Sequence, residues 1–225
     1  ITASTNINRA LPCLETWRKH SLAPIDIIIV ANGPKAMDPP PAEETYTVLP
    51  PTEGYLGSVP AFRKGVDWAL ANTDADIFAC LHDDLEIHEM GWDRKVLSHF
   101  MRHQACGLAG FGGALGLGDA DIYQKPYEPQ QLARVNFRSN LTDAEVHGIR
   151  SLVPEQVACL DGFSQIGRRE FWQGHRYNSV DGSGFSAPER RLKPWTYLEN
   201  LTLKHHLYDS LLGAIAKRHG WETWY

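Results

Sequence analysis

The chain has 225 residues, of which 43% are hydrophobic and 22% are charged. This length and composition suit one globular domain with a full hydrophobic core. The formal net charge is −5, which argues against a nucleic-acid partner because proteins of that class usually present a basic face. The four cysteines lack the CxxC spacing of a zinc site. No run approaches the roughly 20 apolar residues of a membrane-spanning helix, so we expect no integral membrane segment.

The first half of the chain alternates predicted strands and helices. The β-branched run at residues 26–31 is typical of a buried strand. Pro12 is tolerated only near the first turn of a helix, which leaves the start of the first helix open. Alternation of this kind predicts an α/β fold with a doubly wound, mostly parallel sheet flanked by helices. Strands are expected at residues 1–3, 26–31, 45–49, 76–81 and 106–111, and helices at residues 6–20, 60–71 and 91–103.

The second half of the chain is less regular. Residues 107–118 are rich in glycine, but their spacing is not GxGxxG, so a flexible turn is expected there instead of a phosphate-binding loop. Residues 174–194 are rich in Gly, Ser, Pro and Arg, which predicts a long mobile loop. Residues 207–218 have the apolar spacing of a helix, and Gly220 is expected to end it.

Two adjacent aspartates, Asp83 and Asp84, follow the apolar run at residues 77–81, with only His82 between. The carboxyl ends of strands in open α/β sheets face the crevice where ligands bind. Neighbouring carboxylates repel each other, and a divalent cation offsets that cost. Either aspartate alone would be explained by a helix cap or a solvated turn. The pair favours a site for Mg²⁺ or Mn²⁺, with His82 as a further candidate ligand or as a hydrogen-bond partner.

Asp209 lies at the start of the predicted helix at residues 207–218. On local grounds it is best explained as a cap of that helix. The alternative is a general base, which the nearby His205 and His206 would orient. Trp172 and Trp195 flank the predicted mobile loop, where they either stack on a sugar or pack in the ordinary way.

Taken together, the motifs resemble those of a GT-A-type glycosyltransferase close to family 2, over nearly the whole chain. The resemblance rests on the order and spacing of five segments. Residues 2–6 and 27–33 resemble the family's opening strand and its "VVDNGS" strand end, residues 54–65 the "NLG…A.N.G" segment, residues 81–84 the DxD motif, residues 161–171 the segment ending in "RRevF", and residues 208–221 the "ED.DL..R....Gy" segment.

The resemblance implies a single GT-A-like domain over residues 1–225. Its nucleotide-binding half would span residues 1–111, and its less regular, acceptor-binding and catalytic half residues 112–225. Asp84 would bind the Mn²⁺ or Mg²⁺ that bridges the donor's diphosphate, and Asp83 would contact the ribose. Asp209 would be the catalytic base of an inverting transfer. Nucleotide contacts would also come from Thr2, Ala3, Asn32 and Arg63, and sugar contacts from Asp161, Gly162, Trp172 and Trp195.

This chain departs from the family pattern at several acids. His82 stands at the first acid of the DxD motif, and Ala31 at the first acid of the "VVDNGS" strand end. Tyr208 replaces the glutamate that usually precedes the base, Leu211 the second acid of that motif and Ile215 its arginine. An altered acceptor site, a divergent branch or lost catalysis would each explain these changes.

The sequence therefore predicts a metal-dependent, inverting glycosyltransferase. It would move a sugar from a nucleotide diphosphate donor, with a UDP-sugar favoured, to a hydroxyl of a carbohydrate or lipid-linked acceptor. One alternative is a catalytically inactive nucleotide- or sugar-binding protein on the same fold. Another is a sugar nucleotidyltransferase, although residues 2–6 lack that class's glycine-rich, basic loop. We expect a cytoplasmic protein, peripheral to a membrane if the acceptor is lipid-linked.

Overall fold

The computed structural model describes residues 1–37, 46–116, 133–135, 153–177, 193–200 and 208–225. The chain forms two compact units, of which the first comprises Ile1–Gln104 and Trp195–His206 and the second Ala105–Pro194 and Leu207–Tyr225. The division between these units falls before residue 105. The expected single domain over residues 1–225, with halves of residues 1–111 and 112–225, stays a prediction. The segment Trp195–His206, expected in the second half, clusters with the first unit.

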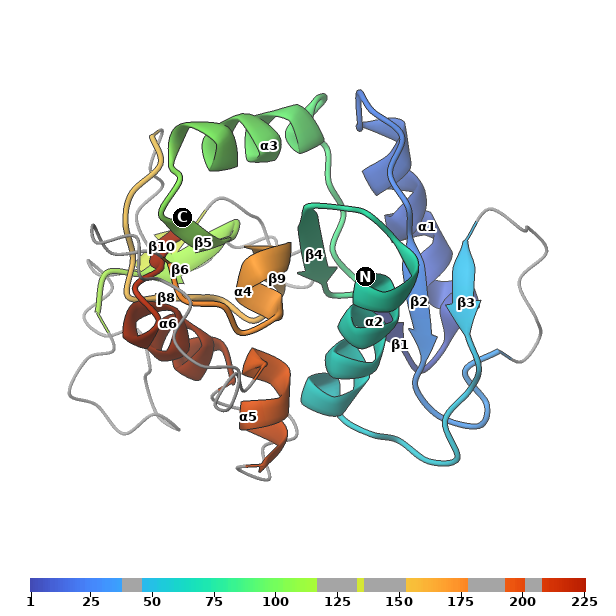
Figure 1. The fold of residues 1–225 in the computed structure, drawn as a ribbon. Helices are drawn as coiled ribbons and strands as arrows, with labels where there is room; N and C mark the ends of the chain where they lie inside the picture. The colour runs from blue at the N-terminus through green and yellow to red at the C-terminus, as the bar shows by residue number, and fades with distance from the viewer. Residues whose placement is uncertain (38–45, 117–132, 136–152, 178–192, 201–207) are drawn as a thin grey trace. The chain divides into compact units, whose positions relative to one another are not determined.

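The first unit is built on parallel strands flanked by helices (Figure 1). Strand β1 pairs in parallel with β2, and β2 pairs in parallel with β3. The Ile1 nitrogen donates to the Ala79 carbonyl at 2.8 Å, and the Leu81 N–H donates to the Ile1 carbonyl at 3.0 Å. This pattern is typical of parallel neighbours and places β4 beside β1. The elements are β1 (Thr2–Ser4), α1 (Ile7–Lys19), β2 (Ile28–Ala31), β3 (Thr47–Leu49), α2 (Ser58–Asn72), β4 (Ile77–Leu81), α3 (Trp92–Arg102) and α5 (Pro194–Asn200).

The strand order in this unit is thus β3-β2-β1-β4, with α1 between β1 and β2 along the chain and α2 between β3 and β4. This is the arrangement of a Rossmann-like nucleotide-binding fold, and it confirms the predicted α/β class with a parallel sheet and flanking helices. Strand β2 is buried along its whole length, as its β-branched run predicts. Helix α2 lies close against the sheet at Gly65, where an added Cβ would overlap Ile1 Cγ2 and lie 3.1 Å from Val30 Cγ2.

Helix α1 begins at Ile7, with Asn6 as its N-cap. The Asn6 side chain accepts a hydrogen bond from the Arg9 N–H at 3.2 Å, which satisfies one of the free donors of the first turn. Pro12 consequently lies inside the helix, further from its start than the proline alone suggested. The buried face of α1 has helical spacing and consists of Ile7, Ala10, Leu14 and Trp17.

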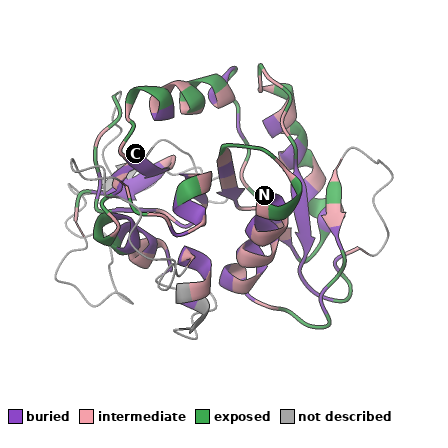
Figure 2. Ribbon diagram, viewed as in Figure 1, coloured by how far each residue is buried: buried purple, intermediate pink, exposed green. Residues whose placement is uncertain are grey.

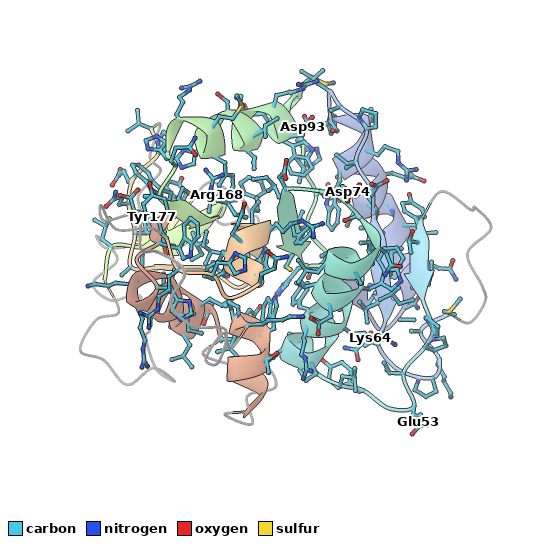
Figure 3. All side chains as sticks on the ribbon, viewed as in Figure 1. Glu53, Lys64, Asp74, Asp93, Arg168 and Tyr177 are labelled. Atoms are coloured by element: carbon cyan, nitrogen blue, oxygen red, sulfur yellow. The ribbon has the colours of Figure 1, made fainter. Side chains whose placement is uncertain are left out.

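Asp93, in the first turn of α3, fixes the segment that follows α1 (Figure 3). Its two carboxylate oxygens accept hydrogen bonds from the Leu22 and Ala23 N–H groups, each at 2.9 Å. Burial opposes the charged form, but the hydrogen bonds to the carboxylate outweigh it and lower the pKa of Asp93 from its ordinary value. The charged side chain therefore stabilises the folded state.

We expect Asp93→Asn to lower the free energy of unfolding at neutral pH by about 1 kcal/mol, because a charged acceptor of two hydrogen bonds is lost at a partly exposed position. The folded pKa is depressed, so this stabilisation is present above the unfolded pKa of about 3.9 and is lost as the pH falls through the folded pKa. Urea unfolding should show the difference at pH 7, and the two curves should converge in acid. Asp74→Asn, at an exposed position, serves as the control. It should change neither the free energy of unfolding at pH 7 nor its dependence on pH.

The second unit contains strands that are mostly antiparallel, in keeping with its less regular sequence. Strand β5 pairs in parallel with β10 and antiparallel with β9, while β6 lies between β7 and β8, antiparallel to both. Arg168 at the end of β9 donates from Nε to the Cys106 carbonyl at 2.7 Å (Figure 3). The elements are β5 (Cys106–Ala109), β6 (Gly112–Ala114), β7 (Ala133–Val135), β8 (Cys159–Leu160), β9 (Ser164–Arg168), α4 (Arg169–Trp172), α6 (Tyr208–Arg218) and β10 (Glu222–Trp224).

The glycine-rich segment corrects one prediction. Gly112 and Gly113 belong to strand β6, where the sequence predicts a flexible turn. An added Cβ on Gly113 would lie 2.5 Å from the Cys159 carbonyl oxygen, and one on Gly110 would lie 2.5 Å from the Ser164 carbonyl oxygen. Both contacts are with main-chain atoms, so the glycines permit close approach of neighbouring backbone. Residues 117–118 lie outside the described residues.

Most side chains of β1, β2 and the inner face of α2 are buried (Figure 2). The predicted mobile loop at residues 174–194 falls largely outside the described residues, as do residues 38–45 of the proline-rich segment. Among the described residues, no helix combines the length and the apolar character needed to cross a membrane.

Candidate functional site

The two predicted acids lie at the topological switch point of the first unit. From β1 the chain runs toward β2 and β3 on one side, and β4 lies on the other side of β1. Residues 5–6 and residues 82–84 follow the carboxyl ends of these two strands. In open α/β sheets, ligands bind in the crevice outside this pair of strand ends. Asp83 and Asp84 are therefore placed where the fold class binds its ligands.

The side chain of Asp84 is 87% exposed, and its Oδ1 lies 4.0 Å from Nδ1 of His82. Asp83 is partly buried in the same turn. In the described part of the chain, no three His, Cys, Asp or Glu side chains are grouped so as to hold a metal ion. Mg²⁺ usually keeps several waters and is bound by one or two carboxylates together with substrate phosphates. The donor set at this turn thus fits a cation that arrives with a phosphate ligand, and does not form a closed metal site.

Phe62 on α2 supports the turn that holds the acids. Its ring is stacked on the His82 imidazole, with centroids 6.4 Å apart, and on the Trp195 indole of α5, with centroids 5.7 Å apart. Phe62 and Trp195 are both buried. This three-ring stack restrains His82 beside Asp84. Phe62 was not among the predicted site residues, although its helical spacing from Val59 and Val66 places it on the buried face of α2.

The residues of the first unit that were predicted to contact the nucleotide are buried or bonded within the protein. Thr2 in β1 is fully buried, and Ala3 is partly buried. Asn32 directly follows β2, where its side-chain oxygen accepts the Leu56 N–H at 2.9 Å and thereby ties down the segment before α2. Arg63 on α2 pairs with Asp67 at 3.4 Å. The nucleotide roles of these residues remain predictions.

The second unit brings together three other predicted residues, Asp161, Gly162 and Asp209. The Tyr208 hydroxyl, at the start of α6, donates to the Gly162 carbonyl at 2.8 Å. Burial raises the pKa of the Cys159 thiol to about 11, and the carboxylates of Asp209 and Asp161 act in the same direction. The negative charges of both acids therefore disfavour the thiolate of Cys159, which places Asp161 and Asp209 in the neighbourhood of this one side chain.

Asp209 lies in the first turn of α6, and its Oδ1 accepts the N–H of Ser210 at 2.7 Å. This hydrogen bond agrees with the local explanation of Asp209 as a residue that stabilises the helix start. A carboxylate has further acceptor positions, so the contact does not conflict with a role as a base. His205 and His206 lie outside the described residues.

Both tryptophans that were predicted as sugar platforms are buried. Trp172 is packed over Gly167, where an added Cβ would lie 2.7 Å from the indole nitrogen. Trp195 is packed against Phe62. Burial of both rings favours the packing alternative, and their contacts with a sugar remain predictions.

Comparison with known proteins adds little to this geometry. No protein-family model matches the chain, and no curated protein matches it. One of the solved structures with a similar fold is 2-C-methyl-D-erythritol 4-phosphate cytidylyltransferase from Thermus thermophilus, at 11% sequence identity. The match covers 99% of this chain and 85% of that chain, with a TM-score of 0.46. A likeness at this level is no basis for a conclusion on function.

Proposed function

We propose that this protein is a metal-dependent transferase that binds a nucleotide diphosphate-sugar and moves the sugar to an acceptor hydroxyl. The observation that supports the proposal best is the position of Asp83 and Asp84 at the carboxyl end of β4, beside β1. Strand ends of this kind bind nucleotides in Rossmann-like folds, and an exposed carboxylate there suits a cation that is shared with a diphosphate.

In this proposal Asp84 would hold Mn²⁺ or Mg²⁺, and Asp83 would hold the ribose or complete the ion's coordination. The bound cation would neutralise the negative charge that develops on the leaving diphosphate. His82, restrained by Phe62, would orient the Asp84 carboxylate. Asp209 would accept the proton of the acceptor hydroxyl as its oxygen attacks the anomeric carbon. The last role requires Asp209 to come within reach of the bound donor.

Nucleotidyl transfer, which joins a nucleotide to a sugar phosphate, is the alternative chemistry for the same acids. The structural neighbour is named as a cytidylyltransferase, but the likeness is too weak to decide. The turn between β1 and α1 is short, since Ser4 Oγ accepts the Asn6 N–H at 3.1 Å and Asn6 caps the helix. It contains no lysine or arginine, which are expected where a loop after the first strand binds a nucleoside triphosphate.

The products of the reaction discriminate between these functions. The protein should be incubated with Mn²⁺ and a labelled panel of nucleotide-sugars in the presence of a mixed acceptor pool, and separately with nucleoside triphosphates and sugar 1-phosphates. We expect release of UDP together with label on an acceptor. Release of pyrophosphate in the second incubation would favour nucleotidyl transfer instead. Nucleotide binding by calorimetry without any product would indicate a binding protein, and absence of nucleotide binding would contradict the proposal.

A further inference from the structure

Helix α3, the turn before it and the segment after α1 present an apolar surface to solvent. We call Leu22, Met90, Leu97 and Met101 the α3 apolar surface; between 40% and 67% of each residue is exposed. Leu97 and Met101 are four residues apart and therefore share one helix face. Leu22 lies at the start of this face, because an added Cβ on Gly91 would come within 2.9 Å of Leu22 Cδ1. A group of exposed apolar side chains on one element marks an interaction surface.

The charge around this surface is opposite in sign to that of the chain. Residues 88–104 contain three Arg or Lys and two acids, whereas the whole chain has a net charge of −5. Glu89 is paired with Lys95, and Asp93 is bound to main-chain N–H groups. Among the described residues, no ion pair joins an acid to Arg94 or Arg102. Arg102 donates one hydrogen bond to Ser98 Oγ at 2.7 Å, which leaves its other N–H groups for an anionic partner. The exposed apolar side chains are thus accompanied by two exposed arginines that no acid in the described part of the chain neutralises.

We propose that the α3 apolar surface binds an anionic membrane surface. A helix in the membrane interface lies in its plane, with Leu and Met side chains at the boundary between headgroups and acyl chains and with basic residues on lipid phosphates. The long stems of Arg94 and Arg102 allow their charges to stay at headgroup level. This inference is independent of the proposed function.

Two other partners fit the surface less well. In a symmetric dimer the same patch of two copies would meet, which would place the arginines of both copies, four like charges, in one interface. Single-stranded nucleic acid is bound by aromatic side chains that stack on bases, whereas the exposed side chains here are Leu and Met.

Co-sedimentation of the full chain with vesicles tests the proposal. We expect binding to vesicles of phosphatidylcholine and phosphatidylglycerol, little binding to phosphatidylcholine alone, and loss of binding in high salt. The double variant Leu97→Ser with Met101→Ser should bind these vesicles at least about tenfold more weakly than the unmodified chain. Arg94→Gln with Arg102→Gln should weaken binding by about 25-fold, since each basic residue near an anionic surface contributes about fivefold.

Val153→Ser is the matched apolar control, because Val153 is 64% exposed and belongs to the second unit. Lys217→Gln, at an exposed position on α6, is the matched charge control. Both should bind like the unmodified chain, and circular dichroism should show that every variant is folded. The proposal is overturned if the unmodified chain does not bind anionic vesicles, or if the α3 variants bind as well as the controls. It is also overturned if the chain elutes as a dimer that the apolar double variant dissociates.

Discussion

Asp84→Asn is expected to abolish the Mn²⁺-dependent part of nucleotide binding. The change removes the exposed charge that would hold the cation and leaves the shape of the turn intact. We expect the affinity for UDP in the presence of Mn²⁺ to fall by about 100-fold, which corresponds to about 2.8 kcal/mol. Without metal, the affinity should stay as it is in the unmodified chain. Isothermal titration calorimetry with and without Mn²⁺ measures both values.

Asp76→Asn is the matched control for this experiment. Asp76 is an exposed aspartate immediately before β4, at the opposite end of the strand from Asp84. Its substitution changes the net charge by the same amount and should leave metal-dependent binding unaltered. If Asp84→Asn binds UDP with Mn²⁺ as tightly as the Asp76→Asn control, the metal role of Asp84 is wrong.

Asp209→Asn is expected to lower kcat by about 10²- to 10⁴-fold, the range typical of a lost general base, and to leave the affinity for the donor unchanged. Asparagine keeps an oxygen that can accept the Ser210 N–H, so the start of α6 should stay folded. Single-turnover assays with a labelled nucleotide-sugar separate donor binding from the chemical step.

Asp161→Asn is the comparison for this variant, because Asp161 also lies near Cys159 but is expected to contact a sugar. It should raise KM more than it lowers kcat. Unchanged turnover in Asp209→Asn would contradict the assignment of the base.

A second test measures the distance between spin labels at the exposed positions Glu86 and Ala214, after Cys13→Ser, with the donor bound. A separation longer than an extended nucleotide-sugar would also contradict it.

Features determined by neighbours in sequence could be predicted. The β-branched run before Asn32 became a strand buried along its length, since such residues fit a pleated interior. The helix expected at residues 6–20 formed as α1, although its start was left open until the structure showed the Asn6 side chain accepting a hydrogen bond from the first turn. Asp83 and Asp84 came at the end of β4 because the apolar run before them is a strand. The parallel sheet followed from the alternation of such segments.

Features determined by distant neighbours could not be predicted. Gly113 belongs to a strand because a side chain there would meet the main chain at Cys159, a residue far along the sequence. The position of Trp195 in the first unit depends on its contact with Phe62, and no local pattern connects the two rings. The same limit applies to the candidate site, where the sequence pointed to the acids beside His82 but not to the Phe62 ring that stacks on it.

The return of Trp195–His206 to the first unit affects how the protein can be made and dissected. During synthesis the ribosome must release the chain through Trp195 before Phe62 can meet the indole that covers it, so the first unit cannot complete its interior from residues 1–104 alone. A fragment that ends at Gln104 would leave the Phe62 ring open to water and prone to aggregation. A soluble amino-terminal fragment will therefore need the Trp195 helix attached through a designed linker.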